Sequence, residues 1–412
     1  GMDGVYILDS SFENVRYLDV FESLIWTTRY KEPGEFELYI PYTKELLSDL
    51  SVGRYVYTND FYDAASNTAH LMIIESVELD DNHLKVTGRS LRSILARRII
   101  WGQTVIKKKD DNETSITVYE AIKKLVTEAI ITPVEPKDFD NPFYPSIHYD
   151  MSEERARRVI SNFVWDEDSG EWPEITEETQ YDCDNLLDAI NDLCVKYKVG
   201  YEVLLDFDDK CMHMHLIRPV DHSWDQTEAP AVVFSPEFDN LKKSNYIESV
   251  EKYKNVAIVR GYRYSDDDIG KFQQTAIRGD ASGMARRELY VDQSSLDYEN
   301  EPHPGDVTGW DSYEEQLKEK GKTELEKKEY SYTKVYDGEA DAEAMTDYVF
   351  NRDYKIGDTV ELITRYGESV EVRVTEMVLS ASTSGVTLIP TFEATRYEAE
   401  EADNALNQGG DS

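Results

Sequence analysis

Cysteine and long apolar runs are both scarce in this sequence. Three cysteines occur in 412 residues, at Cys183, Cys194 and Cys211. Their odd number and their spacing fit neither a disulfide framework nor a paired-cysteine zinc site, so we expect synthesis in a reducing compartment. No run of about 18 apolar residues is present, and we find no apolar segment typical of a signal peptide. The sequence therefore predicts neither a membrane span nor a secretion signal.

Basic residues are also few. The chain has 44 Lys and Arg against 83 Asp and Glu, which gives a formal net charge of −39. Such a charge repels nucleic acids and anionic membranes, which argues against DNA binding through a basic patch. A hydrophobic content of 40% and 28 tyrosines favour a folded protein. The length of the chain predicts roughly two to four domains.

The common catalytic and cofactor-binding motifs are missing as well. None of the patterns GxSxG, HExxH and GxGxxG occurs. Gly321-Lys322-Thr323 imitates the end of a phosphate-binding loop, but Gln316 stands where that loop needs its first glycine. We therefore expect no enzyme activity, and we assign no catalytic residue, no cofactor-binding residue and no cofactor.

The most informative pattern is a succession of three predicted strands that occurs near each end of the chain. Each copy opens with a glycine, Gly53 or Gly357, that precedes an alternating strand. Because glycine can turn sharply where a side chain would clash, it suits the start of such a strand. The strand segments are 52–57, 71–77 and 84–88 in the first copy and 356–362, 372–378 and 386–390 in the second. This repeat favours a scaffold over a single-site enzyme.

We predict an α+β, multidomain fold, with two related β-barrel-like modules near the chain ends and α/β segments between them. A polar stretch over about 137–179 is long for a structureless connection, so it is expected to be an exposed insertion. The predicted divisions are 2–100 for the first β-barrel module, 101–235 for an α/β middle domain, 236–330 for a mixed β/α domain, 331–397 for the second β-barrel module and 398–412 for an acidic disordered tail.

Three helices can be placed from local signals. Thr117 and Glu120 form a capping box that predicts the start of one helix. An apolar stripe over 184–197 predicts a second, and Gly200 stands where a left-handed cap is expected. A third, highly charged helix is expected over 312–328.

Cys211, His213 and His215 alternate along a predicted strand, so their side chains are expected on one face. Thiolate and imidazole are good ligands for zinc. Residues two apart on a strand lie about 7 Å from each other, so three in a row would strain to meet one ion. No fourth ligand is evident. We assign no metal, and two interpretations stay open: a metal site at these three candidates, or a polar face on a hairpin of 201–207 and 211–217.

Several short blocks of sequence resemble one known family. The blocks are 24–30 with 34–38 and Pro41, then 84–91 with Leu95 and Arg98, then 286–290, and finally 354–360 ending at 390–392. Their order and spacing, from about residue 3 to 395, resemble the siphovirus-type tail proteins of phages and prophages of Gram-positive bacteria. Within that group the chain is similar to baseplate or tail-tip hub proteins and to the N-terminal part of tail-associated lysins.

The resemblance implies a structural virion protein. It implies a homotrimeric hub with two barrel domains per subunit, so that six barrels match a hexameric tail tube. The implied partners are other tail proteins: the tail tube, the distal tail protein and fibre or tip proteins. The implied location is the virion tail tip, after synthesis in the bacterial cytoplasm. An acidic inner surface would also let DNA pass through a lumen without specific binding.

Two other functions stay open on the sequence alone. One is a tail-associated cell-wall hydrolase or endopeptidase, for which the stretch over 137–179 would be the place to look. The other is an adhesin that binds host cell-wall glycan, with Trp165 and Trp172 exposed as the residues that read the sugar. No catalytic residue can be carried over from the family to this chain.

Overall fold

The computed structural model describes residues 4–108, 110–135, 151–238, 240–241, 243–264, 271–293, 307–341 and 348–394. The chain forms two compact units. Unit 1 comprises residues 1–244 and 337–392, and unit 2 comprises residues 245–336 and 393–412. The predicted acidic tail over 398–412 lies outside the described residues.

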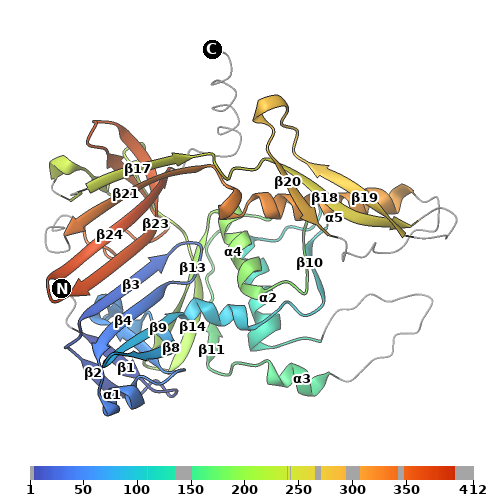
Figure 1. The fold of residues 1–412 in the computed structure, drawn as a ribbon. Helices are drawn as coiled ribbons and strands as arrows, with labels where there is room; N and C mark the ends of the chain where they lie inside the picture. The colour runs from blue at the N-terminus through green and yellow to red at the C-terminus, as the bar shows by residue number, and fades with distance from the viewer. Residues whose placement is uncertain are drawn as a thin grey trace. The chain divides into compact units, whose positions relative to one another are not determined.

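The first and the last parts of the chain share one sheet in unit 1. Strand β3 (Ser23–Arg29) pairs antiparallel with β23 (Ser369–Ser382), with Arg29 opposite Glu376 and Ser23 opposite Ser382. The blue and red strands lie side by side in Figure 1. The order of strands in unit 1 is β24-β23-β3-β4-β9-β8-β5-β1-β2. The other strands on this path are β1 (Val5–Leu8), β2 (Asn14–Leu18), β4 (Glu35–Pro41), β5 (Tyr55–Thr58), β8 (Met72–Asp80), β9 (His83–Ser90) and β24 (Gly385–Ala394).

The two repeated segments start with the same backbone geometry. Gly53 before β5 has φ +92° and Gly357 before β22 (Thr359–Ile363) has φ +93°. The Gly53 amide donates to the Ile74 carbonyl, and the Gly357 amide donates to the Val374 carbonyl, both at 2.8 Å. In return, the Ile74 amide donates to the carbonyl after Gly53 at 2.8 Å, and the Val374 amide to the carbonyl after Gly357 at 2.9 Å. The predicted likeness of the two segments therefore extends to their hydrogen bonds.

The sheet differs from the two separate barrels expected from the sequence. Among the described residues, the strand order has two ends and does not close on itself. The reason lies in β23, which is 14 residues long. Its first half pairs with β22 and its second half pairs with β3, so the two repeated segments become parts of one sheet. Short parallel pairs add β15 (Asp221–His222) and β16 (Val233–Phe234) to β22.

Strand β4 has the alternation that the sequence predicts. Phe36, Leu38 and Ile40 are buried, with exposed fractions of 2%, 0% and 2%, whereas Glu35 and Pro41 at the ends are exposed. Its neighbours are β3 and β9. One face of this strand therefore contributes to the core of unit 1.

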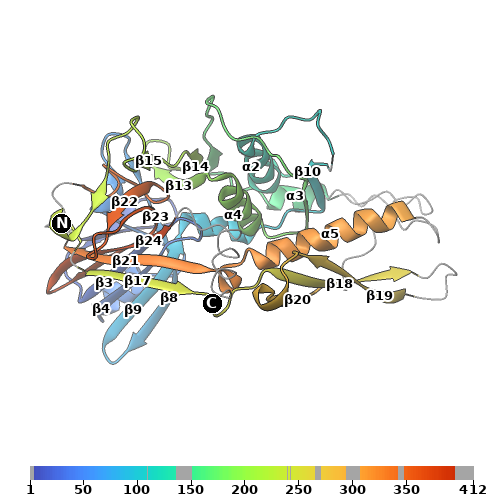
Figure 2. The ribbon, with the colours of Figure 1, turned by 90° about the horizontal axis from the view of Figure 1, so that it is seen from above.

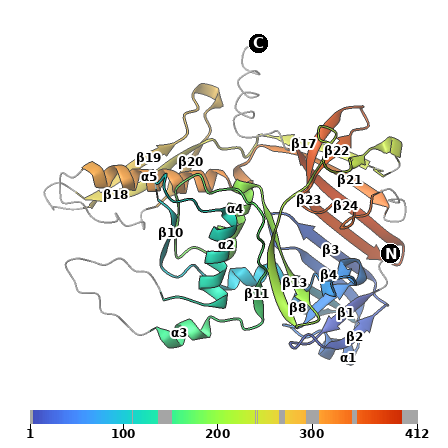
Figure 3. The same cartoon turned by 180° about the vertical axis from the view of Figure 1, so that it is seen from behind.

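Two helices of unit 1 pack together over a smaller sheet. Helix α2 (Val118–Val126), extended by a π-helical turn Thr127–Ile131, lies beside α4 (Leu186–Tyr197) (Figure 3). Their buried faces join the 3-10 segment Leu91–Arg97 and the smaller sheet in one apolar cluster. The strands of that sheet, in order, are β11 (Phe163–Trp165), β14 (Cys211–Ile217), β13 (Gly200–Asp206), β7 (Thr68–Ala69) and β6 (Tyr62–Asp63).

The helix ends show one prediction confirmed and one wrong. Thr117 caps α2, and its Oγ1 accepts a hydrogen bond from the Glu120 amide at 3.2 Å, as the capping box predicts. At the end of α4 the left-handed residue is Lys198, with φ 56°, and not Gly200. The helix ends at Tyr197, so the cap falls on the next residue, and Gly200 already lies in β13.

The expected insertion over 137–179 is only partly described, from residue 151 onward. Within that part, β11 pairs parallel with β14, and four large apolar side chains are buried: Phe163, Trp165, Trp172 and Ile175. The prediction of an exposed insertion is therefore wrong for 163–175. The buried apolar residues are few and are surrounded by a mostly polar segment, so the sequence shows no sustained apolar pattern there.

Unit 2 is a small sheet covered by one helix. Strand β18 (Val256–Tyr264) lies between β19 (Lys271–Arg278), which is antiparallel to it, and β20 (Glu288–Asp292), which is parallel to it. Helix α5 (Val307–Leu325) runs along β18 (Figure 2). Tyr313 and Leu317 pack on Ala257 and Val259 of the strand.

Gly321, the glycine of the rejected phosphate-loop pattern, lies inside α5. A Cβ atom there would lie 2.8 Å from Cγ2 of Val259 and 2.9 Å from Cβ of Ala257. This glycine therefore allows the helix to approach the sheet closely.

The remaining elements are short or connect these layers. They are α1 (Lys44–Asp49), β10 (Gln103–Lys107) paired with β12 (Thr179–Asp182), α3 (Ser152–Arg157), and the strands β17 (Lys243–Ser249) and β21 (Thr333–Asp341), which carry the chain across the boundary between the units. Among the described residues, no helix combines the length and the apolar character that crossing a membrane requires.

Candidate functional site

The hairpin of β13 and β14 brings most of the candidate residues together. Its register pairs Glu202 with His215 and Asp206 with Cys211. Met212, Met214 and Leu216 of β14 are buried in the core. Because side chains alternate along a strand, Cys211, His213 and His215 lie on the opposite face, as the sequence predicts.

The three candidates do not converge on one point. Sγ of Cys211 lies 3.5 Å from the backbone oxygen of Asp209, whereas the two imidazoles contact different carboxylates. Burial raises the pKa of the Cys211 thiol, and the nearby Asp209 and Asp206 carboxylates raise it further. The thiolate form that a metal needs is therefore disfavoured here.

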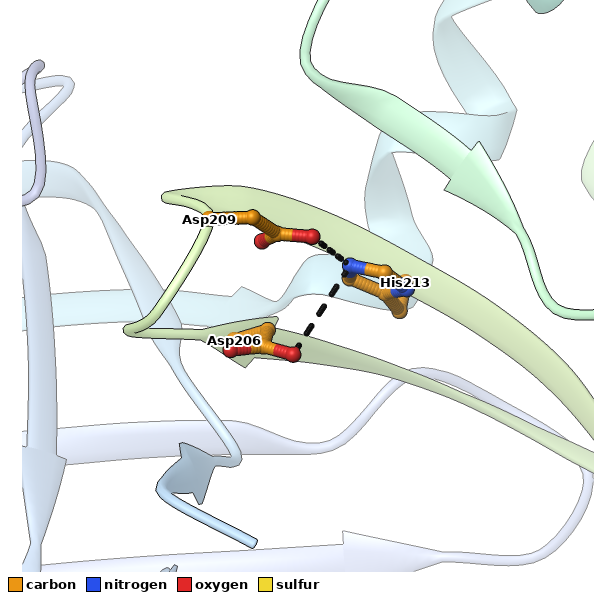
Figure 4. Close-up of side chains that lie close together, drawn as sticks. All are labelled: Asp206, Asp209 and His213. Carbon is orange, nitrogen blue, oxygen red and sulfur yellow. Dashed lines mark hydrogen bonds and ion pairs between the residues drawn. The ribbon is translucent and has the colours of Figure 1, made fainter.

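A different group is closer to metal-binding geometry. Nε2 of His213 lies 2.6 Å from Oδ2 of Asp209 and 4.0 Å from Oδ2 of Asp206 (Figure 4). One ligand atom from each of the three residues lies within 4.8 Å of the others. An imidazole and two carboxylates could hold a divalent ion after a small closure. In the structure the same imidazole is placed to donate hydrogen bonds to carboxylates on both of its edges.

Asp166 and Glu202 link the two histidines into a longer row. Nδ1 of His213 lies 2.6 Å from Oδ1 of Asp166, and Nδ1 of His215 lies 3.5 Å from Oδ2 of the same residue. Nε2 of His215 lies 2.7 Å from Oε1 of Glu202, whose Oε2 lies 3.7 Å from Nε2 of His70. We call these residues the imidazole–carboxylate row: Asp206, Asp209, His213, Asp166, His215, Glu202 and His70.

Carboxylates and imidazoles alternate along the row, and their contacts shift the pKa values of His213, His215 and Glu202. Burial is the largest single effect on His215 and opposes its imidazolium form. The hydrogen bond and charge of Glu202, together with the charge of Asp166, outweigh burial and raise the pKa of His215. The pKa of His213 is raised in the same way, because Asp166 and Asp209 outweigh the effect of burial. Burial alone would raise the pKa of Glu202, yet His215 and His70 lower it to about 2. Within the row, Glu202 is therefore favoured as a carboxylate, and His213 and His215 are favoured as imidazoliums.

His70 and Glu202 also line a pocket in unit 1. The pocket holds about 800 Å³ of empty space, counting the solvent at its mouth. Its wall includes the aromatic rings of Trp26, Tyr30 and Tyr201. Enclosure lowers the pKa of His70, although 39% of that side chain still faces the cavity. At this wall of the pocket, a neutral His70 imidazole lies beside the ionised Glu202 carboxylate, which also contacts His215.

Of the members of this row, sequence reasoning proposed only His213 and His215 as site residues. It missed Asp206, Asp209, Asp166, Glu202 and His70. Glu202 could have been found, because the tight turn of the predicted hairpin places it opposite His215. Asp166 and His70 come from segments far away in the sequence, and no local signal indicates their approach. Nothing in the structure supports a common ion for Cys211, His213 and His215.

Trp165 and Trp172 are not available as sugar readers. Each side chain is only 8% exposed. The Trp165 indole donates a hydrogen bond to the Tyr119 hydroxyl at 3.0 Å, and the Trp172 ring stacks on Tyr119 with centroids 5.6 Å apart. The guanidinium of Arg218 covers the Trp172 ring at 3.6 Å. Exposed tryptophans at these positions, as the adhesin alternative requires, are excluded, because both rings fill the core beside α2.

Solved structures of tail proteins have similar chain paths over nearly their whole length. A tail protein from Neisseria meningitidis MC58 is 13% identical, with 95% of this chain and 96% of that chain covered and a TM-score of 0.48. A 43 kDa tail protein of prophage MuSo2 from Shewanella oneidensis is 10% identical, with 95% and 98% covered and a TM-score of 0.47. The prophage tail protein gp18 from Listeria monocytogenes EGD-e is 11% identical, with 98% of each chain covered and a TM-score of 0.44.

A comparison with curated protein sequences finds no match. The comparison with protein families gives a match that spans almost the whole chain. The model of the family described as Siphovirus ReqiPepy6 Gp37-like protein matches residues 4–392. Those residues include both repeated segments, the imidazole–carboxylate row and residues 245–336 of unit 2. The chain therefore belongs to the Siphovirus ReqiPepy6 Gp37-like family of phage tail proteins.

Proposed function

We propose that this tail protein is a structural hub of the baseplate or tail tip, in which three copies form a ring that adapts the tail tube to the host-facing tip. The observation that carries the proposal is the duplication inside one chain. Gly53 and Gly357 open two strand successions with matching φ values and matching hydrogen bonds. Three copies would present six such segments, the number needed to meet the hexameric tube that the family resemblance implies.

In this proposal the two repeated segments are the equivalent parts that each subunit contributes to the ring, and the ring surrounds a lumen. The net charge of −39 would repel the phosphates of DNA from the wall of that lumen, so that DNA passes without specific binding. The neighbours in the virion would be the tail tube, the distal tail protein and fibre or tip proteins. The chain would act without hydrolysing the cell wall.

The solution mass of the purified protein tests the assembly. Light scattering over a range of concentrations is expected to give a trimer, and more trimer at high salt, because salt screens the repulsion between chains of the same sign. A mass equal to one chain at every concentration and salt would contradict a self-assembling ring.

Two further measurements test the place and the lack of hydrolysis. Gold-labelled antibody against this chain is expected to decorate one end of the phage tail in electron micrographs. Label along the tube or on the capsid would contradict a hub. Incubation with purified host cell wall is expected to release no soluble fragments, and release above the level of a heat-inactivated sample would favour the hydrolase.

A further inference from the structure

Four arginines gather around one hollow of unit 1, in a chain that is strongly acidic overall. The hollow has a volume of about 680 Å³, counting the solvent at its mouth. It is formed where the end of the 3-10 segment Leu91–Arg97 meets α3. The residues that line it are Ala96, Arg97, Arg98, Ile99, Glu154, Arg157 and Arg158. We call it the arginine pocket.

Backbone carbonyls, and not carboxylates, hold two of these guanidiniums. Arg98 donates from Nε and Nη2 to the carbonyl of Arg158, at 3.1 and 2.8 Å, and from Nη1 to the carbonyl of Arg97 at 3.0 Å. Arg158 donates from Nη2 to the carbonyl of Ile99 at 2.6 Å, and its guanidinium stacks over Trp101 at 4.9 Å. These contacts fix both side chains without neutralising their charges.

The positive charge of the pocket is only partly balanced. Glu154, the acidic residue of the lining, pairs with Arg157. Burial lowers the pKa of Arg98 and of Arg158, and a neighbouring arginine lowers each further, Arg97 for the first and Arg98 for the second. Holding like charges close together in this way is unfavourable unless an anion joins them.

One donor atom of a pocket arginine lacks an acceptor inside the described part of the fold. Within the part of the chain that the structure describes, Nη1 of Arg158 is buried and has no hydrogen-bond partner. A buried donor left unpaired destabilises a fold by about 1–3 kcal/mol, and more when it carries charge. Because Nη1 is shielded from solvent, an anion bound in the open pocket would act mainly by offsetting the repulsion between the guanidiniums.

The geometry points to a binding site for a phosphate group in the arginine pocket, carried by a phosphorylated ligand. Guanidinium forks match the oxygens of phosphate in pairs. A planar carboxylate can be satisfied by a single fork, whereas guanidiniums from two separate segments offer donors from several directions, as a tetrahedral phosphate requires. The overall charge of −39 repels polyanions over long range, so recognition would take place at this local concentration of arginine. The inference does not depend on the proposed trimer.

The test is calorimetric titration of the full chain with inorganic phosphate at low salt. Saturable binding is expected, with competition by sulfate and none by acetate at equal concentration. Arg158→Gln and the exposed Arg97→Gln are each expected to weaken binding roughly tenfold or more, from the loss of a charged hydrogen bond. The matched control is Arg365→Gln, whose side chain contacts Tyr366 far from the pocket lining in sequence; it is expected to bind like the wild type.

Absence of phosphate binding in the wild type, or equal affinity in the wild type and both pocket variants, would overturn the inference. If Arg158→Gln does not fold, Arg158→Lys replaces it, because lysine keeps the charge without the paired donors of the guanidinium. The phosphate affinity of Arg97→Gln still tests the pocket independently. Two further titrations identify the source of the phosphate. Tighter binding of a short phosphodiester oligomer than of a sugar monophosphate would support a polymeric ligand, and the reverse order would support a free phosphorylated molecule.

Discussion

The equivalent glycines Gly53 and Gly357 allow one substitution to be compared in two surroundings. Their φ values are +92° and +93°, so alanine meets the same unfavourable backbone conformation at both. A Cβ at Gly53 would have no heavy atom within 4 Å, whereas a Cβ at Gly357 would lie 3.0 Å from Cδ2 and from Cε2 of Tyr30. The difference in the free energy of unfolding between Gly53→Ala and Gly357→Ala therefore isolates the contact with the Tyr30 ring.

The expected magnitudes follow from these surroundings. A left-handed conformation disfavours alanine by about 1–2 kcal/mol, and the reduced entropy of the unfolded chain offsets about 0.4–1 kcal/mol of that. Gly53→Ala should then lower the free energy of unfolding by about 1 kcal/mol. Gly357→Ala should lower it by a further 1–3 kcal/mol, roughly, because its Cβ overpacks the core. The Tyr30 ring cannot easily retreat, since it is buried and its hydroxyl donates to the Val199 carbonyl at 2.9 Å.

Urea unfolding followed by tryptophan fluorescence measures both losses in the same unit of the fold. Gly367→Ala is the control, because that glycine also has a positive φ, +83°, and open surroundings. It should behave like Gly53→Ala. Equal losses at Gly53 and Gly357, or the larger loss at Gly53, would refute the reasoning about Tyr30.

Three other substitutions test the imidazole–carboxylate row, the packing of unit 2 and the core of unit 1. The pKa of Glu202 is lowered to about 2 from its ordinary 4.5, so its carboxylate stabilises the fold above pH 4.5 and loses this effect as the pH falls toward 2. Glu202→Gln should therefore lower the free energy of unfolding by about 2–3 kcal/mol near pH 5.5, and by less in acid; a loss independent of pH would contradict this. Gly321→Ala, which would stabilise an exposed helix, should instead lower the melting temperature of unit 2, because its Cβ would lie 2.8 Å from Val259; a higher melting temperature would count against the packing described. Trp172→Ala should reduce the free energy of unfolding, measured in a denaturant titration, by about 3–5 kcal/mol. A variant as stable as the wild type would contradict the placement of this ring in the core.

Local features of the fold could be predicted from the sequence because their signals are local. The alternation of Phe36, Leu38 and Ile40 predicts the buried face of β4, and Thr117 with Glu120 predicts the start of α2. In both cases neighbours in sequence are also neighbours in space. The likeness of the strand successions at Gly53 and Gly357 was visible for the same reason.

Long-range contacts could not be predicted in this way. Nothing in the local pattern of β3 indicates that its partner is β23, and without that pairing two separate barrels were the simpler expectation. The candidate site shows the same limit. The sequence places His213 and His215 on one face, but Asp166 reaches them from a segment whose polar neighbours suggested an exposed insertion. The site was therefore found in part: His213 and His215 were identified, whereas His70 and the carboxylates that set their charge were missed.

The pairing of β3 with β23 also has a consequence for synthesis on the ribosome. The side chains of Arg29 and Glu376, joined by a hydrogen bond across these strands, are 347 residues apart in the chain. At a translation rate of roughly 5–20 residues per second, about 17–70 s separate their emergence. During that interval one edge of β3 has no strand to pair with, and an unpaired edge is a template for aggregation. The nascent chain therefore has a window in which a chaperone, or fast completion of translation, decides between folding and aggregation.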